Sequence, residues 1–278
     1  MQELTLNKHG WEPQTRRHTA PISDGIADDL IASHDGKREV LQTTAWNQNA
    51  EDIALLRRLL RYKVKFSNPP RPARLSGIRA SNEWFGTTPP KPTHRRYACK
   101  EANLYMLVPQ MKPLLERISE DMWAKFKEVF PEQSVEHERL VTEGINKDWW
   151  IGNTPFTSGI INDANALPYH RDSGNLKGAW SMMLCLKDGI DGGGLHMPEY
   201  DITLGIPDQS LTIFNGQGNW HGVTPWKIKR KDAYRYTLVW YVKDAIKQCG
   251  CAEDEARRAA AYSTRIADEW EREEGRAS

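Results

Sequence analysis

Hydrophobic residues recur at helical spacing in two stretches of the first half of the chain. Between residues 49 and 62, NAEDIALLRRLLRY places its leucines and its isoleucine on one face, behind an asparagine of the type that caps helices. Residues 110–130 again carry apolar side chains at every third or fourth position. We therefore expect two amphipathic helices, the second of which backs a sheet. Residues 1–48 show no strong period and predict irregular structure with a strand or two.

The second half of the chain has a different texture, with short apolar or alternating runs separated by Gly, Asn, Asp and Pro. Such runs, spaced by about 8–12 residues, are typical of a β-sandwich or barrel. Residues 252–275 are charged and rich in alanine, which predicts a terminal helix. The strand-like runs between Trp149 and Val242 are FTSGII, WSMMLCL, GGGLHMPEY, SLTIF and YRYTLVWYV.

These patterns predict an α+β fold in which a β-sandwich or barrel is flanked by supporting helices. We expect one domain over residues 1–278. Its parts are an N-terminal helical and basic region over 1–145, the strand-rich core over 146–245 and a C-terminal helix over 246–278.

Composition limits the classes of protein to which the chain can belong. With 278 residues, 39% of them hydrophobic, it can bury a sizeable core, and no apolar stretch is long enough to cross a membrane. The N-terminus has no apolar stretch of the signal-peptide type, so we expect a cytoplasmic protein without a membrane partner. Four cysteines do not make a disulfide framework, and we expect the Cys249-x-Cys251 pair to be reduced and incidental.

Charge is distributed unevenly although the net charge is only +1. Between Arg57 and Lys100, twelve basic residues stand against a single acid, Glu83. Such a segment either faces a polyanion such as nucleic acid or is a solvated basic face. A second basic run, WKIKRK, covers residues 226–231.

Three residues carry the candidate chemistry: His170 and Asp172 in LPYHRDSGN, and His221 in GNWHGVTP. In an extended segment, residues two apart point to the same side, so His170 and Asp172 can ligate one ion together. Two imidazoles and one carboxylate, with three positions open, form the facial triad of non-haem Fe(II) oxygenases. An isolated H-x-D occurs by chance in many chains, and the surrounding strands and turns favour the metal site here.

A candidate carboxylate-binding pair follows on the last strand-like run. Arg235 lies fourteen residues after His221, and Thr237 shares its strand face. An arginine inside an apolar strand needs a buried partner, and a guanidinium with a nearby hydroxyl can bind a carboxylate through two hydrogen bonds and an added third. This pair fits the distal carboxylate of 2-oxoglutarate.

The region from Trp149 to Val242 resembles the double-stranded β-helix, a jelly-roll or cupin-like core, of the Fe(II)/2-oxoglutarate dioxygenases, and among them the ten-eleven translocation (TET) and J-binding protein (JBP) group. The resemblance rests on the H-R-D-x-x-N form of residues 170–175, on GGGLHMPEYDITL and on LTIFNGQGNWHGVTP, while SGIRASNEWFG (residues 76–86) is similar to the substrate-side segment of compact members. The cysteine-rich zinc region of animal TET proteins and a separate base-J-binding domain are absent from this sequence. A compact form suits a bacterial cell or a phage-infected host.

The resemblance implies that Fe(II) is held by the triad and that 2-oxoglutarate chelates the iron, with its far carboxylate on Arg235 and Thr237. Dioxygen is the second cosubstrate, and a 5-methyl group in DNA is hydroxylated while 2-oxoglutarate becomes succinate. The target nucleotide is flipped out of the duplex. The implied substrate residues are Asn175 for the base edge, Trp84 or Phe85 for stacking, and Arg79.

Each substrate residue has a structural alternative: Asn175 as a turn residue, Trp84 and Phe85 as core, and Arg79 as a cation facing water. His196 is expected to be structural rather than a fourth ligand. We expect a monomer that acts on 5-methylcytosine in DNA. The open alternatives are thymine in DNA, a protein or small-molecule substrate, and a cupin-like DNA-binding module with a vestigial metal site. AlkB-type enzymes carry a second arginine six positions after the first, where this chain has Tyr241.

Overall fold

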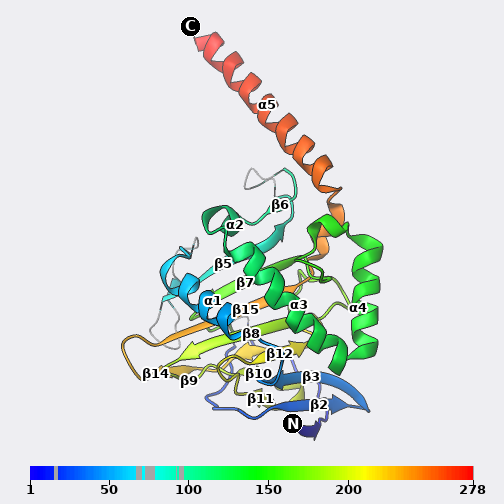
Figure 1. Ribbon diagram of the computed structural model, residues 1–278, viewed down its shortest axis with the longest axis vertical. Helices are drawn as coiled ribbons and strands as arrows, with labels where there is room; N and C mark the ends of the chain where they lie inside the picture. The colour runs from blue at the N-terminus through cyan, green and yellow to red at the C-terminus, as the bar shows by residue number, and fades with distance from the viewer. Residues whose placement is uncertain (16–17, 67–70, 73–78, 92, 94–96, 278) are drawn as a thin grey trace.

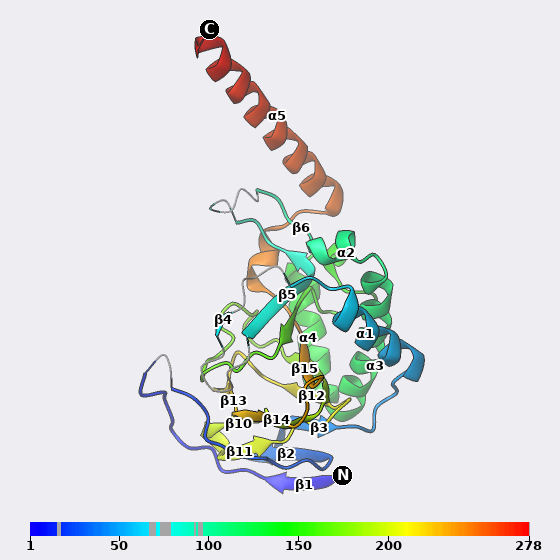
Figure 2. The same ribbon diagram turned by 90° about the vertical axis from the view of Figure 1, so that its left-hand side faces the viewer.

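The computed structural model describes residues 1–15, 18–66, 71–72, 79–91, 93 and 97–277. Two sheets face each other in it, and helices cover the outer side of the larger one (Figures 1 and 2). Within the described residues, ten strands form this major sheet. In spatial order they are β1 (Gln2–Thr5), β2 (Leu30–His34), β3 (Lys37–Thr43), β12 (Leu211–Phe214), β8 (Ser181–Asp188), β15 (Tyr234–Tyr241), β7 (Ser158–Asp163), β5 (Arg79–Thr88) and β4 (Arg71–Pro72), with β6 (Lys100–Glu101) paired to β5.

The smaller sheet consists of short strands that alternate with the major sheet along the chain. Its strands are β11 (Ile202–Leu204), β10 (Leu195–Met197) and β13 (Gly222–Val223), and a separate ribbon pairs β14 (Trp226–Ile228) with β9 (Ile190–Gly192). From β7 onward the chain crosses repeatedly between the two sheets, and every ladder of this part is antiparallel. This is the double-stranded β-helix that the sequence predicts, and the fold prediction is confirmed.

Strand β8 shows how the sequence builds two cores. Successive side chains of a strand point to opposite faces. Met182, Leu184 and Leu186 therefore join the core under the helices, whereas Met183 and Cys185 join the core between the two sheets. A run that is apolar at every position, such as WSMMLCL, is what a strand with two buried faces requires.

Helices pack on the outer face of the major sheet (Figure 1). The two predicted helices are present, and Asn49 accepts the amide hydrogens of Glu51 and Asp52 as the expected cap. A further helix, α4 (Pro131–Gly144), directly follows α3 (Met111–Val129). Its buried residues are two polar residues and one valine, so its sequence lacks the apolar repeat that predicts a packed helix. The helices are α1 (Ala50–Tyr62), α2 (Asn103–Leu107), α3 (Met111–Val129), α4 (Pro131–Gly144) and α5 (Ala252–Ala277), with 3-10 turns η2 (Lys147–Trp149), η3 (Pro198–Tyr200) and η4 (Asp244–Gln248).

The first 48 residues are more regular than the sequence pattern indicates. They contribute three strands, β1 to β3, which extend the major sheet beyond β12. Strand β5, from the basic region, pairs with β7 on the other side of the sheet. One sheet thus takes strands from both sides of residue 145, where the sequence suggested a boundary between parts.

The C-terminal helix α5 projects away from the body of the molecule (Figures 1 and 2). Glu255 anchors its first turns: the side chain is 1% exposed and accepts the amide hydrogens of Cys99 and Gly250. Among the helices of the described chain, none combines the length and hydrophobicity of a membrane span.

Cys99 and Cys249 form a disulfide beside this anchor, with 5.8 Å between their α-carbons. The expectation that the Cys249-x-Cys251 pair is reduced is therefore wrong for Cys249, while Cys251 is a free thiol. The partners are 150 residues apart, and only the pairing of distant segments brings them together.

His137 of α4 is fully buried and ties two loops to the helix. Its Nε2–H donates to the carbonyl of Pro155 over 2.8 Å, and its Nδ1 accepts the amide hydrogen of Trp180 over 3.0 Å. Burial lowers the pKa of His137 from 6.5 to about 4. The ring is therefore neutral in the folded protein over a range of pH in which it is protonated in the unfolded chain.

This difference predicts acid sensitivity. As the pH falls from about 6.5 towards about 4, the unfolded chain binds a proton that the folded protein refuses, so the free energy of unfolding decreases. The contribution of this one histidine is up to roughly 1.4 kcal/mol per pH unit. Urea unfolding of the wild type and of His137→Gln at several pH values measures it. Between these pH values, the unfolding free energy of the variant should depend less steeply on pH than that of the wild type, by the contribution of one proton. An equal dependence on pH in both proteins would show that His137 does not cause the acid sensitivity.

Candidate active site

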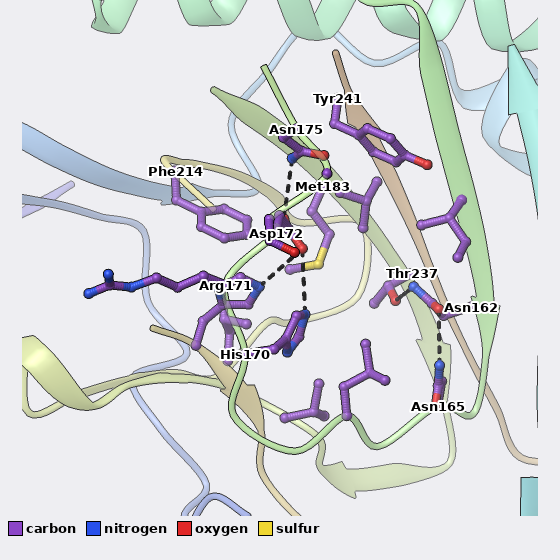
Figure 3. A pocket seen from close by; sticks show the side chains of 18 of the residues that line it. Asn162, Asn165, His170, Arg171, Asp172, Asn175, Met183, Phe214, Thr237 and Tyr241 are labelled. Carbon is purple, nitrogen blue, oxygen red and sulfur yellow. Dashed lines mark hydrogen bonds and ion pairs between the residues drawn. The ribbon is translucent and has the colours of Figure 1, made fainter. Parts of the chain in front are cut away.

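The candidate ligands His170, Asp172 and His221 converge in a pocket between the two sheets. Their ligand atoms all lie within 4.8 Å of one another. Nε2 of His170 lies 3.5 Å from Oδ1 of Asp172, and Nε2 of His221 lies 3.9 Å from the same oxygen. Figure 3 shows His170 and Asp172 on the same side of the pocket.

Backbone pairing brings the two histidines together. Each histidine donates its amide hydrogen to the carbonyl of the other, over 2.9 and 3.0 Å. The two residues form an isolated bridge next to β13 of the smaller sheet. The chain does not continue as a regular strand after His170, so the expected extended segment is only a single bridged residue. Asp172 is held instead by its amide hydrogen bond to the carbonyl of Gly216. A side chain at Gly216 would collide with the Asp172 carboxylate.

Hydrogen bonds set the tautomer of both histidines. Nδ1 of His170 lies 2.9 Å from the carbonyl of Pro168, and Nδ1 of His221 lies 3.0 Å from that of Asn219. Because a carbonyl only accepts, each Nδ1 carries the hydrogen, which leaves Nε2 free as a metal ligand.

The electrostatics of the site suit a cation. Burial lowers the pKa of His221 to about 4, so this ring is neutral near pH 7. Burial alone would raise the pKa of Asp172, but the hydrogen bond to His170 and the charges of both histidines bring it below its usual value. Burial alone would lower the pKa of His170, but the hydrogen bond and charge of Asp172 raise it above its ordinary value. A bound cation would displace the proton from this ring, and two imidazoles with an ionised carboxylate are a donor set that fits Fe(II), as the facial triad requires.

Arg235 lies in the same pocket, on β15, and is 2% exposed. Its Nε and Nη2 donate to the carbonyl of Gly193 over 3.1 and 2.7 Å, and its guanidinium lies over the ring of Trp226. Its Nη1 has no hydrogen-bond partner among the described residues. A buried cationic donor without an acceptor is costly, so this arrangement favours an anionic ligand in the pocket.

Thr237 lies on the same face of β15 and also lines the pocket. It accepts a hydrogen bond from Asn162 over 3.4 Å, and Asn162 in turn accepts one from Asn165 over 3.2 Å. Figure 3 shows these three side chains together on one wall. The two asparagines are pocket residues that sequence reasoning missed; the signal was the pair of asparagines in NDAN, which directly follows the apolar run FTSGII.

Of the two aromatic residues expected at the substrate, only Trp84 lines the pocket. Phe85 is 0% exposed and packs edge-on against Trp240 in the core under the helices, so its expected stacking role is wrong. The reason is the alternation of β5, which sends neighbouring residues to opposite faces. The ammonium group of Lys243 lies 4.7 Å from the centroid of the Trp84 ring. Lys243 lies an even number of residues after Arg235 and Thr237, so an extended chain places all three side chains on the same face. This spacing is the signal in the sequence that could have identified Lys243.

Asn175 closes the turn that begins at Asp172 and also lines the pocket. Its amide group lies 3.5 Å from the Asp172 carboxylate and 3.4 Å from the Ser181 hydroxyl. These contacts favour the turn role, in which Asn175 orients a candidate ligand. Arg79 begins β5, and its side chain lies outside the described residues.

His196 lies outside the pocket lining. Its Nδ1 is 2.5 Å from the hydroxyl of Tyr169, so it packs behind the ligands as a structural group. The pocket as a whole has a volume of about 330 Å³. This lies at the lower end of the roughly 300–1,000 Å³ of ligand pockets in proteins.

The two basic runs differ in how many of their charged side chains form ion pairs. In the run 226–231, Lys229 pairs with Asp191, and Arg230 pairs with Asp188 and Asp232. In the longer run, Arg57 binds Asp208 and the hydroxyl of Tyr234. Four cations at the end of α1 are exposed, and the side chains of five arginines lie outside the described residues. The exposed four are Arg58, Arg61, Lys63 and Lys65, and the five are Arg71, Arg74, Arg79, Arg95 and Arg96.

Comparisons with known proteins agree with this geometry. No family model matches the chain. Thymine dioxygenase JBP1 of Crithidia fasciculata is 23% identical over 155 residues, which are 55% of this chain and 18% of JBP1. The match therefore spans less than a fifth of that protein.

Among solved structures, NgTET1 in complex with 5mC DNA matches with a TM-score of 0.57 at 11% identity, covering 90% of this chain and 88% of NgTET1. An oxidoreductase of the 2OG-Fe(II) oxygenase family from Burkholderia pseudomallei gives a TM-score of 0.49 at 12% identity, covering 77% of this chain and 88% of that one. In fold the chain is similar to NgTET1, and over 155 residues its sequence is similar to thymine dioxygenase JBP1, which supports a TET/JBP-like oxygenase.

Proposed function

We propose that this protein is an Fe(II)- and 2-oxoglutarate-dependent dioxygenase that hydroxylates the 5-methyl group of 5-methylcytosine in DNA. The observation that carries the proposal is the Nη1 of buried Arg235, which has no partner among the described residues, in the same pocket as the His170, Asp172 and His221 triad. A cation site and an anion site in one pocket fit a metal-chelating dicarboxylate such as 2-oxoglutarate.

The residues divide the work by their chemistry. Nε2 of each histidine and the Asp172 carboxylate would hold Fe(II), which when bound supplies the activation of dioxygen for hydroxylation. Nη1 of Arg235 would donate to the distal carboxylate of 2-oxoglutarate, with the Thr237 hydroxyl as a second donor. Decarboxylation of 2-oxoglutarate to succinate and CO₂ takes one oxygen atom of dioxygen, and the methyl group takes the other.

Two observations support DNA as the substrate. The exposed cations at the end of α1 suit phosphate groups, which dominate the affinity of proteins for DNA. Trp84 offers a half-buried ring at the pocket on which a flipped base could stack. A base inside a duplex is out of reach of a pocket between two sheets, so we include flipping of the target base in the proposal. We further propose that the protein acts as a monomer.

Thymine in DNA is the second candidate substrate, favoured by the similarity to a protein named thymine dioxygenase. The two bases share the 5-methyl group and differ at the exocyclic position 4, an amine in 5-methylcytosine and a carbonyl in thymine. Asn175 and Asn165 each carry both a donor and an acceptor, so either base can be accommodated by their chemistry.

Nucleoside mass spectrometry tests the proposal. DNA containing cytosine, 5-methylcytosine and thymine is incubated with the protein, Fe(II), 2-oxoglutarate and ascorbate under air. We expect a gain of one oxygen on 5-methylcytosine, with equimolar succinate from coupled turnover. Oxygen on thymine alone would replace the first candidate with the second. Unchanged bases, with iron binding demonstrated, would refute DNA as the substrate and direct the search to proteins and small molecules.

A further inference from the structure

Glu199 is a buried acid that contacts both ligand-bearing segments. It lies in η3, is 5% exposed, and uses its two carboxylate oxygens on different partners. Oε1 accepts a hydrogen bond from Nη2 of Arg171 over 2.9 Å, and Oε2 accepts the amide hydrogen of Trp220 over 2.6 Å. A buried carboxylate is stable only with such partners, so both contacts hold it in one position.

The two partners are neighbours of all three candidate ligands in sequence. Arg171 stands between His170 and Asp172, and Trp220 directly precedes His221. The Arg171 side chain points away from the pocket (Figure 3), and its guanidinium lies 5.0 Å from the centroid of the Trp220 ring. Carboxylate, guanidinium and indole therefore form one contact group behind the ligands, which we name the Glu199 link.

Two backbone contacts join the ligand-bearing segments: the pair of hydrogen bonds between His170 and His221, and the bond from the amide of Asp172 to the carbonyl of Gly216. They position the main chain of both segments. Side-chain contacts on the far side of the first segment add a further connection. The Glu199 link joins the segments at Arg171, between the two ligands that the first segment supplies.

We propose that Glu199 is a positioning residue for the metal site, acting through Arg171 and Trp220 to hold Asp172 and His221 at ligand distance. The inference rests on the triad of the proposed function. It requires metal binding only, whatever substrate the protein oxidises. Outer groups that orient metal ligands typically contribute about 10–100-fold to metal affinity.

The test measures binding of Mn(II) to the intact protein by calorimetry and by electron paramagnetic resonance, in the absence of 2-oxoglutarate and substrate. In Glu199→Gln, the amide oxygen can still accept from Trp220, but the NH₂ group faces the donors of Arg171. We expect binding about 10–100-fold weaker than in the wild type. Unchanged affinity would overturn the inference.

Arg171→Gln separates positioning from simple electrostatics. Loss of a positive charge near the site would strengthen the binding of a cation, whereas loss of the Glu199 link weakens it. We expect weaker binding, and we expect the double variant R171Q/E199Q to bind no worse than E199Q, because both changes break the same link. Tighter binding by R171Q would overturn the inference.

Glu255→Gln is the matched control for folding. Glu255 is also a buried glutamate that accepts two amide hydrogens and pairs with an arginine, Arg258, but it lies at the base of α5. E255Q should bind Mn(II) with wild-type affinity, and circular dichroism establishes that every variant is folded. If the wild type itself binds no metal, the proposed function fails together with the inference. If it binds and E199Q binds equally well, only the inference fails.

Discussion

Replacing Asp172 with alanine is expected to abolish turnover. The change removes the single anionic donor of the triad and leaves two imidazoles, 34% and 6% exposed, to hold a divalent cation. Because changes in groups behind the ligands already weaken metal binding by about 10–100-fold, the loss of a ligand should cost at least about 100-fold. Mn(II) titration and succinate formation measure the two effects.

Asp163→Ala provides the control for this experiment. Asp163 is a carboxylate of β7 whose partner is Ser81, and it does not line the pocket. Burial raises its pKa to about 6, so its removal relieves an unfavourable buried charge rather than creating one. D163A should retain metal binding and turnover. Full activity of D172A would refute the metal site and with it the proposed function.

Replacing Arg235 with methionine is expected to raise the KM for 2-oxoglutarate by about 150–5,000-fold. Breaking a buried ion pair by removing one partner costs about 3–5 kcal/mol, and each 1.36 kcal/mol is tenfold in affinity. The apoprotein should lose little stability, since the loss of the two hydrogen bonds to Gly193 is offset by removal of a buried cation with one donor that has no partner among the described residues. Methionine has a similar volume and can fill the space.

Thermal unfolding with and without 2-oxoglutarate distinguishes this effect from damage to the fold. The wild type should be stabilised by 2-oxoglutarate in the presence of Mn(II), and R235M should not. Arg57→Lys changes an arginine of α1 that pairs with Asp208, and the KM of this variant for 2-oxoglutarate should stay at the wild-type value. A normal KM in R235M would show that the distal carboxylate binds elsewhere.

Several features of the site follow from local sequence alone. His170 and Asp172 are two positions apart, and Arg235 and Thr237 share one strand face, so their proximity within each pair follows from backbone geometry. The helix over residues 50–62 follows from its apolar spacing and the Asn49 cap, because both are properties of consecutive residues. The short apolar runs separated by turn residues likewise indicate a fold built from packed strands, because such a fold can bury the apolar side chains of each run.

Other features depend on which segments meet in space. The pattern of β5 gives no preference between Trp84 and Phe85, because a shift of the strand by one residue exchanges their faces; pairing of Phe85 with Gly159 of β7 decides it. Three further contacts join residues far apart in the chain: Cys99 with Cys249, Glu199 with both ligand segments, and Arg230 with Asp188.

Residue types at short spacing are sufficient to predict the pairs His170 with Asp172 and Arg235 with Thr237, and the resemblance of the strand-like segments to known oxygenases predicts the double-stranded β-helix. The tertiary structure decided which aromatic ring reaches the pocket, that two asparagines and Lys243 line it, and that half of the second basic run is neutralised. It also decided that Glu199 links the ligand segments. These features depend on contacts between segments that are far apart in the chain, and the spacing of neighbouring residues contains no information about such contacts.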